Sequence, residues 1–204
     1  MCIRDSLIVA SIAFFNYYRK GFHISKLTWP FIITSIPFAL FGGFLVIDGT
    51  LYDTLLSIVL IWAAFRILRI DTENRVNKLN IPSLKTSLPI GGGIGFISGI
   101  IGVGGGIFLS PIMMLNKWAS AKNIAATSAL FIWVNSAAGI TGAAISGQLN
   151  IDFEILIPFS IMVILGGIIG SRLGAVNAND ATIRRLLVVV LILAAMKRVT
   201  ELIF

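Results

Sequence analysis

Charged residues are scarce in this chain. They make up 12% of its 204 residues, while hydrophobic residues make up 57%. A soluble domain usually has about a quarter of its residues charged, and so little charge cannot cover a water-soluble globule of this length. The composition therefore excludes an ordinary soluble domain and indicates that most of the chain lies in lipid.

Cysteine and histidine are nearly absent. The one cysteine, Cys2, excludes an internal disulfide and a cysteine-based metal cluster. The one histidine, His23, lies in a polar connection, where a histidine is usually just solvated. We therefore predict no metal site and no cofactor.

Motifs for catalysis and energy coupling are also missing. No Asp or Glu lies inside an apolar block, so the sequence offers no buried carboxylate as a proton relay. The sequence has no Gly-Lys-Ser/Thr phosphate loop, which excludes ATP hydrolysis by that route. No nucleophile–base pair lies within a predicted helix, so we predict that the protein is not an enzyme.

The apolar residues come in long blocks. Several approach the ~20 residues that are needed to cross ~30 Å of hydrocarbon. Lipid offers no hydrogen-bond partner to the backbone, so these blocks must be helices or parts of helices. The predicted fold class is all-α, a polytopic integral membrane helical bundle. The predicted helices cover residues 7–18, 28–47, 51–68, 88–115, 123–145, 153–173 and 181–204.

Two halves of the chain look related. With Gly21 set on Gly147, each half continues into a helix that holds a Gly-Gly pair, at 42–43 and at 166–167. We predict an internal duplication, with chance similarity as the alternative, because small residues recur in membrane helices anyway. The predicted boundaries are 7–69 for the remainder of the first repeat, 70–86 for a polar cytoplasmic linker and 87–204 for the second repeat.

The first six residues do not fit a membrane helix. No small-residue cleavage site follows Met1 to Ser6, as it would after a signal peptide. The hexapeptide resembles an adapter-derived lead on a translated read. We predict that residues 1–6 are non-native and that the natural sequence is truncated at its N-terminus.

Lys and Arg are concentrated in four connections. These are residues 19–26, 66–85, 117–122 and 172–185, while the two remaining connections carry only acidic charges. The positive-inside rule puts the four basic connections in the cytoplasm and the other two outside. The predicted membrane is the bacterial plasma membrane. The net charge of +7 is therefore interpreted as topology information, and no nucleic acid is predicted to bind.

This assignment makes residues 88–115 begin and end on the same side of the membrane. The element would then be glycine-broken and re-entrant, and would open the second repeat. Inverted repeats around a broken helix recur in secondary transporters. The alternative is a single crossing, with short loops that break the charge rule.

The motif that indicates a binding site lies in residues 91–111. Its second part reads Gly-x3-Gly-x2-Gly-x-Gly-Gly-Gly-x4-Pro, and each interior helix glycine costs roughly 0.5–1 kcal/mol relative to alanine. A half-helix that starts at Gly104 to Gly106 would direct unpaired N–H groups and its positive dipole end at an anion. For Gly95 and Gly99, close helix contact is the alternative reading.

That run, followed by Asn-Ile-Ala-Ala-Thr-Ser-Ala-Leu at 123–130, resembles the TauE/SafE family of sulfite exporters and related transporters. The resemblance implies two four-helix repeats, each opening with such a glycine motif. It also implies a plasma-membrane carrier of small anions, often sulfur-containing ones such as sulfite or sulfonates. This chain departs from the pattern because it lacks the first glycine motif.

We therefore predict a multi-pass secondary carrier of small anions, whose partners are the anionic substrate and the lipid bilayer. The alternative is a non-transporting scaffold or subunit whose glycines serve helix packing. Gly91 lies outside the proposed break, so Gly91→Ala is expected to be mild. The predicted substrate-binding residues are Gly102, Gly104, Gly105, Gly106, Thr127, Ser128 and Asn135, and the predicted structural or hinge residues are Gly95, Gly99 and Pro111.

The expected truncation can be tested on DNA. The gene should encode roughly 35–50 further residues upstream, enough to complete a span and supply the missing motif. They should contain a second glycine-rich run that ends in proline, in place of Met1 to Ser6. The contiguous genomic DNA decides this, because a ribosome-binding site and an in-frame stop just before Met1 would contradict it.

Overall fold

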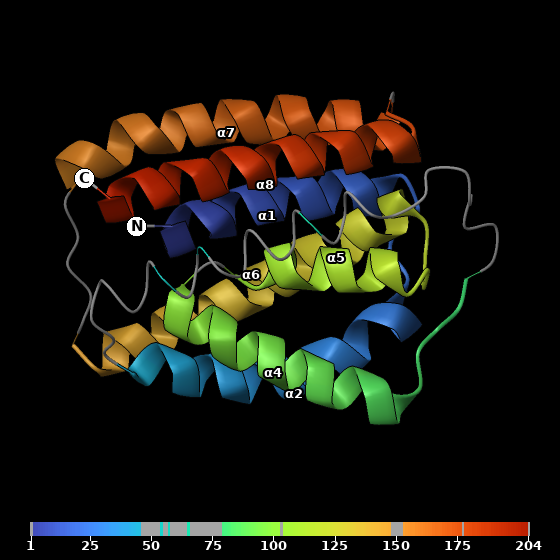
Figure 1. Ribbon diagram of the computed structural model, residues 1–204, viewed down its shortest axis with the longest axis horizontal. Coiled ribbons are helices and arrows are strands. Elements are labelled where there is room, and N and C mark those ends of the chain that lie inside the picture. Colours follow the sequence, from blue (N-terminus) through green and yellow to red (C-terminus); the bar gives the residue numbers. More distant parts are fainter. Residues whose placement is uncertain are drawn as a thin grey trace.

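The computed structural model describes residues 2–45, 79–102, 104–147, 153–176 and 178–203, together with positions 54, 57 and 65. Every regular element in this part of the chain is an α-helix, and the helices lie side by side as a bundle (Figure 1). The predicted all-α class is confirmed. The helices are α1 (Cys2–Arg19), α2 (Ser25–Phe44), α4 (Leu84–Ile101), α5 (Gly106–Leu115), α6 (Ala121–Ile145), α7 (Phe153–Val176) and α8 (Asp180–Ile203).

Three of these helices, α2, α4 and α6, are long and apolar enough to cross a membrane. Large apolar side chains remain exposed on the outside of the bundle, among them Phe41 at 64% and Met162 at 71%. Apolar surface on this scale is unusual for a soluble monomer and is what a helix presents to lipid. The described helices are those of a membrane protein.

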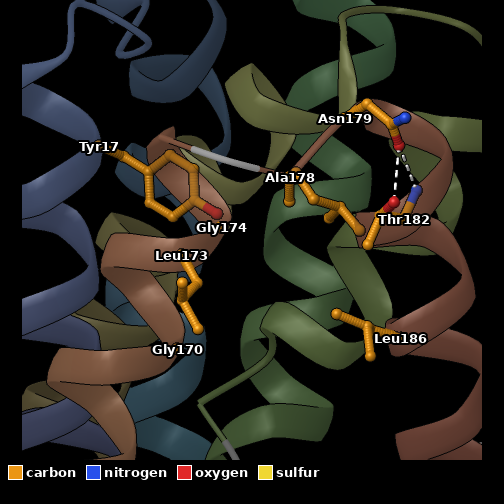
Figure 2. Close-up of a pocket in the computed structure, with 9 residues that line it drawn as sticks. Tyr17, Gly170, Leu173, Gly174, Ala178, Asn179, Thr182 and Leu186 are labelled. Atoms are coloured by element: carbon orange, nitrogen blue, oxygen red, sulfur yellow. Dashed lines mark hydrogen bonds between the residues drawn. The ribbon is translucent and has the colours of Figure 1, made fainter.

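The predicted helix boundaries agree with the structure to within a few residues, apart from the N-terminus of α1. The element predicted at 88–115 is divided into α4 and α5, as its glycines suggested. The C-terminal helix begins at Asp180 because Asn179 caps it. The Asn179 Oδ1 atom accepts hydrogen bonds from the Thr182 amide, at 2.8 Å, and from its hydroxyl, at 2.7 Å (Figure 2). The helix predicted at 51–68 lies outside the described residues.

Helices α2 and α4 run in the same direction and touch through their main chains. A Cβ atom added at Gly95 would lie 2.5 Å from the Ser35 carbonyl oxygen, and one added at Gly42 would lie 2.5 Å from the Phe96 carbonyl oxygen. Any side chain at these positions would force the helices apart. Small residues at such contacts allow the close backbone approach on which helix association in lipid depends.

Helix α6 packs on α2 in the same way. A Cβ atom at Gly43 would lie 2.6 Å from the Gly139 carbonyl oxygen, and one at Gly142 would lie 2.5 Å from that of Leu40. At the other end of this contact, the hydroxyls of Thr28 and Thr127 lie 3.1 Å apart. Together, α2, α4 and α6 form a tightly packed group, and the core that they share with α5 includes Phe31, Leu109 and Phe131.

The chain reverses direction between α4 and α5. Helix α5 runs antiparallel to α6, since Gly106 lies near Ile132 while Ser110 lies near Ser128. The backbone N–H of Asn80, before α4, donates to the Trp118 carbonyl oxygen, after α5, at 2.9 Å. The segment that contains both helices therefore begins and ends at the same end of the bundle (Figure 1).

The four basic connections meet at that end. Lys122, at the start of α6, donates through Nζ to the Ala175 carbonyl oxygen near the end of α7, at 3.3 Å. The same ammonium lies 5.2 Å from the centroid of the Phe22 ring, between α1 and α2. With the Asn80–Trp118 bond, these contacts join the described parts of all four connections. We call this the basic end of the bundle.

Cysteine labelling tests which end faces the cytoplasm. In a Cys2→Ser background, an impermeant maleimide added outside intact cells should label Leu45→Cys, at the far end of α2, but not Lys117→Cys, at the basic end. Both side chains are exposed, so access to the reagent is decided by the membrane. Outside labelling of Lys117→Cys before cell lysis would overturn the assignment.

Candidate functional site

The break between α4 and α5 is built from glycines in the left-handed conformation. Gly102 ends α4 with φ of 71°, and Gly104 and Gly105 follow, each with φ of 74°. Residues with a Cβ rarely adopt this conformation. Gly105 is the N-cap of α5 and makes no side-chain cap hydrogen bond. The Phe108 and Leu109 amides both donate to its carbonyl oxygen, so Gly106 and Ile107 carry the amides that have no partner within the helix.

This helix start lies inside the bundle, about half-way along α6. Cβ atoms added at Gly104 and Gly106 would meet Ile132, in the middle of α6. No carbonyl group among the described residues accepts a hydrogen bond from the Gly106 amide. The N-terminal turn of α5 thus directs its N–H groups and partial positive charge into the interior.

Two serine hydroxyls border the same break, one on each side. A Cβ atom at Gly104 would lie 2.8 Å from the Ser136 Oγ atom of α6, and one at Gly105 would lie 3.2 Å from the Ser98 Cβ atom of α4. Ser98 and Ser136 are each 1% exposed, and neither hydroxyl has a hydrogen-bond partner among the described residues. Most buried polar groups are hydrogen-bonded, so two such groups at one place indicate a site for a polar ligand.

Sequence reasoning missed both serines. Ser98 sits beside Gly99 within the glycine run, and Ser136 follows Asn135. On α6, Ser136 is also eight residues after Ser128, which puts the two on one face of the helix. That spacing was a usable signal, but hydroxyls are common in membrane helices, where they often serve packing.

Two of the predicted binding residues of α6, Thr127 and Ser128, lie on different faces of the helix. Ser128 faces α5, where its hydroxyl lies 2.8 Å from that of Ser110 and its carbonyl oxygen would be 3.4 Å from a Cβ atom at Gly106. Thr127 faces α2 instead, and its hydroxyl is already paired with that of Thr28. Ser128 therefore lies beside the break, and Thr127 lies at the contact between α2 and α6.

Asn135 is buried in the middle of α6. Its Nδ2 atom donates to the Phe131 carbonyl oxygen at 2.9 Å, and its Oδ1 atom has no partner in the part of the chain that the structure describes. The Phe131 ring is the group nearest to a Cβ atom at Gly105, at 2.8 Å. The Asn135 Oδ1 atom can only accept, so a direct contact of Asn135 with an anion would use the second N–H of its side-chain amide.

The other predicted residues have packing positions. Gly95 and Gly99 lie against the main chain of α2, and Pro111 is buried within α5, which continues to Leu115. The mild effect expected for Gly91→Ala is contradicted, because a Cβ atom at Gly91 would overlap the Phe31 main chain. Gly93 is the suitable control, since nothing lies within 4 Å of a Cβ atom there.

The site carries no fixed charge among the described residues. Gly104, Gly105, Ser98 and Ser136 are all neutral. No group of three or more His, Cys, Asp or Glu side chains in the described part of the chain could hold a metal ion. His23 lies in the connection between α1 and α2, where its ring packs edge-on against Phe14 and burial lowers its pKa.

A separate cavity of about 490 Å³ lies where α7 ends and α8 begins (Figure 2). Tyr17 of α1 lines it together with apolar residues such as Leu173 and Leu186. Its polar residues Asn179 and Thr182 bond to each other in the α8 cap. The Asn179 Oδ1 atom is thus used by the helix cap, and this cavity is separate from the glycine break.

Comparisons with known proteins agree with this architecture. Residues 6–198 match the family described as sulfite exporter TauE/SafE. The chain belongs to this family. No solved structure matches it.

Three curated relatives of this TauE/SafE protein are named probable membrane transporter proteins. One is y4hK of Sinorhizobium fredii, which is 30% identical over 195 residues, or 94% of this chain and 78% of the relative. YunE of Bacillus subtilis is 33% identical over 115 residues, or 54% of this chain and 40% of the relative. A protein of Methanocaldococcus jannaschii is 30% identical over 162 residues, or 74% of this chain and 60% of the relative. Family and relatives together support a membrane transporter.

Unfolding measurements test whether the buried hydroxyls are hydrogen-bonded within the protein. Ser98→Ala and Ser136→Ala should each change the free energy of unfolding without anion by no more than about 0.5 kcal/mol, since no hydrogen bond is lost. Ser128→Ala should cost about 1 kcal/mol, because it removes the bond to Ser110. Denaturation of the purified protein in detergent measures this, and an equal loss for all three would show that Ser98 and Ser136 are already paired.

Proposed function

We propose that this protein is a secondary carrier of small anions in the plasma membrane, and that the anion binds at the break between α4 and α5. One observation carries the proposal. The start of α5, which has no side-chain cap, lies beside the buried hydroxyls of Ser98 and Ser136, which have no hydrogen-bond partner among the described residues. All of these groups can donate hydrogen bonds, which is what an oxyanion accepts.

The neutrality of the site suits transport. Hydrogen bonds to an ion contribute about 1.5–3 kcal/mol each, so a few donors can replace much of the hydration of a small oxyanion. A fixed cation would hold the ion more tightly and slow its release, whereas conduction needs binding weak enough to be reversed. The family description, sulfite exporter, supports a sulfur oxyanion such as sulfite, or a sulfonate, as the substrate.

The position of the break supports alternating access. A site half-way along a membrane helix can be opened to either side by small movements of the groups around it, and secondary transporters use broken helices at this depth. The bond between Asn80 and Trp118 supports a re-entrant α4–α5 segment. We propose that the first repeat supplies the matching half of the site and that the repeats rock against each other.

Transport assays test the proposal. The protein, expressed from its complete gene and reconstituted in proteoliposomes, should take up labelled sulfite. Uptake should fall roughly tenfold or more in Ser98→Ala and in Ser136→Ala, the equivalent of one lost hydrogen bond to an ion. Gly105→Val should abolish it, because a side chain there meets Phe131 and cannot adopt φ of 74° without strain.

Gly93→Ala is the matched control, and its uptake should remain near that of the wild type. Thermal-shift measurements with sulfite, thiosulfate, sulfonates and neutral solutes then identify the substrate class. If the two serine variants transport normally and Gly105→Val fails only because it does not insert, the glycines serve packing. The protein would then be a scaffold or subunit and not a carrier with this site.

A further inference from the structure

Three cationic side chains surround one cavity at the basic end of the bundle. The cavity has a volume of about 390 Å³ and lies between the ends of α1 and α7. None of the described residues that line it is acidic. Its lining residues are Asn16, Arg19, Lys20, Arg172, Ala175 and Val176.

These cations have no counter-ion in the described part of the chain. The Arg19 guanidinium lies 5.5 Å from the centroid of the Phe15 ring, and Asn16 donates to the Ser171 hydroxyl at 2.7 Å. A further cation, Lys122, bonds to the carbonyl oxygen of the lining residue Ala175. Like charges that line one cavity repel one another, and a bound anion would relieve that repulsion.

Helix dipoles explain only part of this arrangement. Arg19 lies in the last turn of α1, where a cation is favoured by the negative end of the helix. Arg172 does not lie in the last turn of α7, so the same effect does not account for it. Arginine can bind phosphate through two parallel N–H groups, which makes Arg172 a strong ligand for that chemistry.

An apolar stripe leads from Arg172 along the lipid-facing side of α7. Met162, Leu165 and Ile169 follow one another at helical spacing and are 71%, 52% and 58% exposed. The cavity stands at the end of this stripe, where the basic end would meet the headgroup layer. A free anion would need only the cations, whereas a phospholipid would use both the cations and the apolar stripe.

We propose that this cavity binds the phosphate of an anionic phospholipid, whose acyl chains lie along Leu165 and Ile169. Basic pockets between helices on the cytoplasmic side of a membrane favour such headgroups. The site is distinct from the glycine break. Helix α1 packs on α6 and α7, whereas neither α1 nor α7 packs closely on α4 or α5. The bound lipid would hold α1 against α7 and so stabilise the bundle.

The test measures lipid affinity of the purified protein, expressed from its complete gene, in detergent. Dioleoylphosphatidylglycerol is titrated and the thermal midpoint followed, with dioleoylphosphatidylcholine and inorganic phosphate as parallel arms. We expect phosphatidylglycerol to stabilise the wild type at a lower concentration than either phosphatidylcholine or inorganic phosphate does. Arg172→Gln should weaken this affinity about fivefold, and Arg19→Gln with Arg172→Gln more than about tenfold, since each cation near a membrane surface contributes about 1 kcal/mol.

Arg185→Gln is the matched control, because Arg185 is an exposed cation near the start of α8 that does not line the cavity. It should leave the affinity unchanged. An equal loss in Arg185→Gln, or equal stabilisation by phosphatidylcholine, would show general surface attraction and overturn the proposal. Stabilisation by inorganic phosphate at the same concentration would show a free-anion site and overturn the lipid assignment. Lipid-free midpoints of all variants separate lost binding from lost folding.

Discussion

The close contact of main chains between α2 and α4 is the constraint on which the rest of the structure depends. Lipid offers helices no hydrophobic driving force to associate, so they are held by van der Waals contact and by hydrogen bonds. At Gly95, a side chain would occupy the space of the Ser35 main chain. Without this contact, α4 would stand further from α2, and the reversal that follows α4 would lose its place inside the bundle.

Two kinds of glycine therefore have two different tasks. Those at Gly42, Gly95 and Gly142 make room for a neighbouring main chain. Those at Gly104 and Gly105 provide backbone conformations that reverse the chain. Irregular backbone at membrane depth is tolerated only where protein or a water-filled cavity covers it, and here α4 and α6 provide the cover. The close helix contacts that the first kind allows thus enclose the chain reversal that the second kind provides.

Neutral polar groups and charged groups lie in different parts of the molecule. Around the glycine break, polarity comes from amides and hydroxyls, whose dipoles cost less to bury than a full charge would. The cations Arg19, Arg172 and Lys122 gather at the basic end. Under the proposed function, this division would let the interior contact an anion without holding it permanently, while the end of the bundle would engage charged groups at the membrane surface.

Sequence patterns predicted local features better than they predicted contacts. Apolar blocks located the helices, because a helix in lipid must satisfy its own backbone. The run Gly102 to Gly106 located the break, because glycine there costs helix stability. By contrast, Thr127 and Ser128 are neighbours in sequence, yet one faces α2 and the other α5. Successive helix residues point about 100° apart, and which neighbour each of them meets depends on packing.

The sequence by itself determined the membrane class, the position of the helix break and the gathering of basic connections on one side. These follow from composition and spacing, which act locally along the chain. Only the tertiary structure decided that Ser98 and Ser136 face the break, that Gly91 touches α2 and that Gly93 does not. Those facts depend on how α2, α4 and α6 are rotated about their axes, and that rotation is set by side chains and main chains that lie far apart in the sequence.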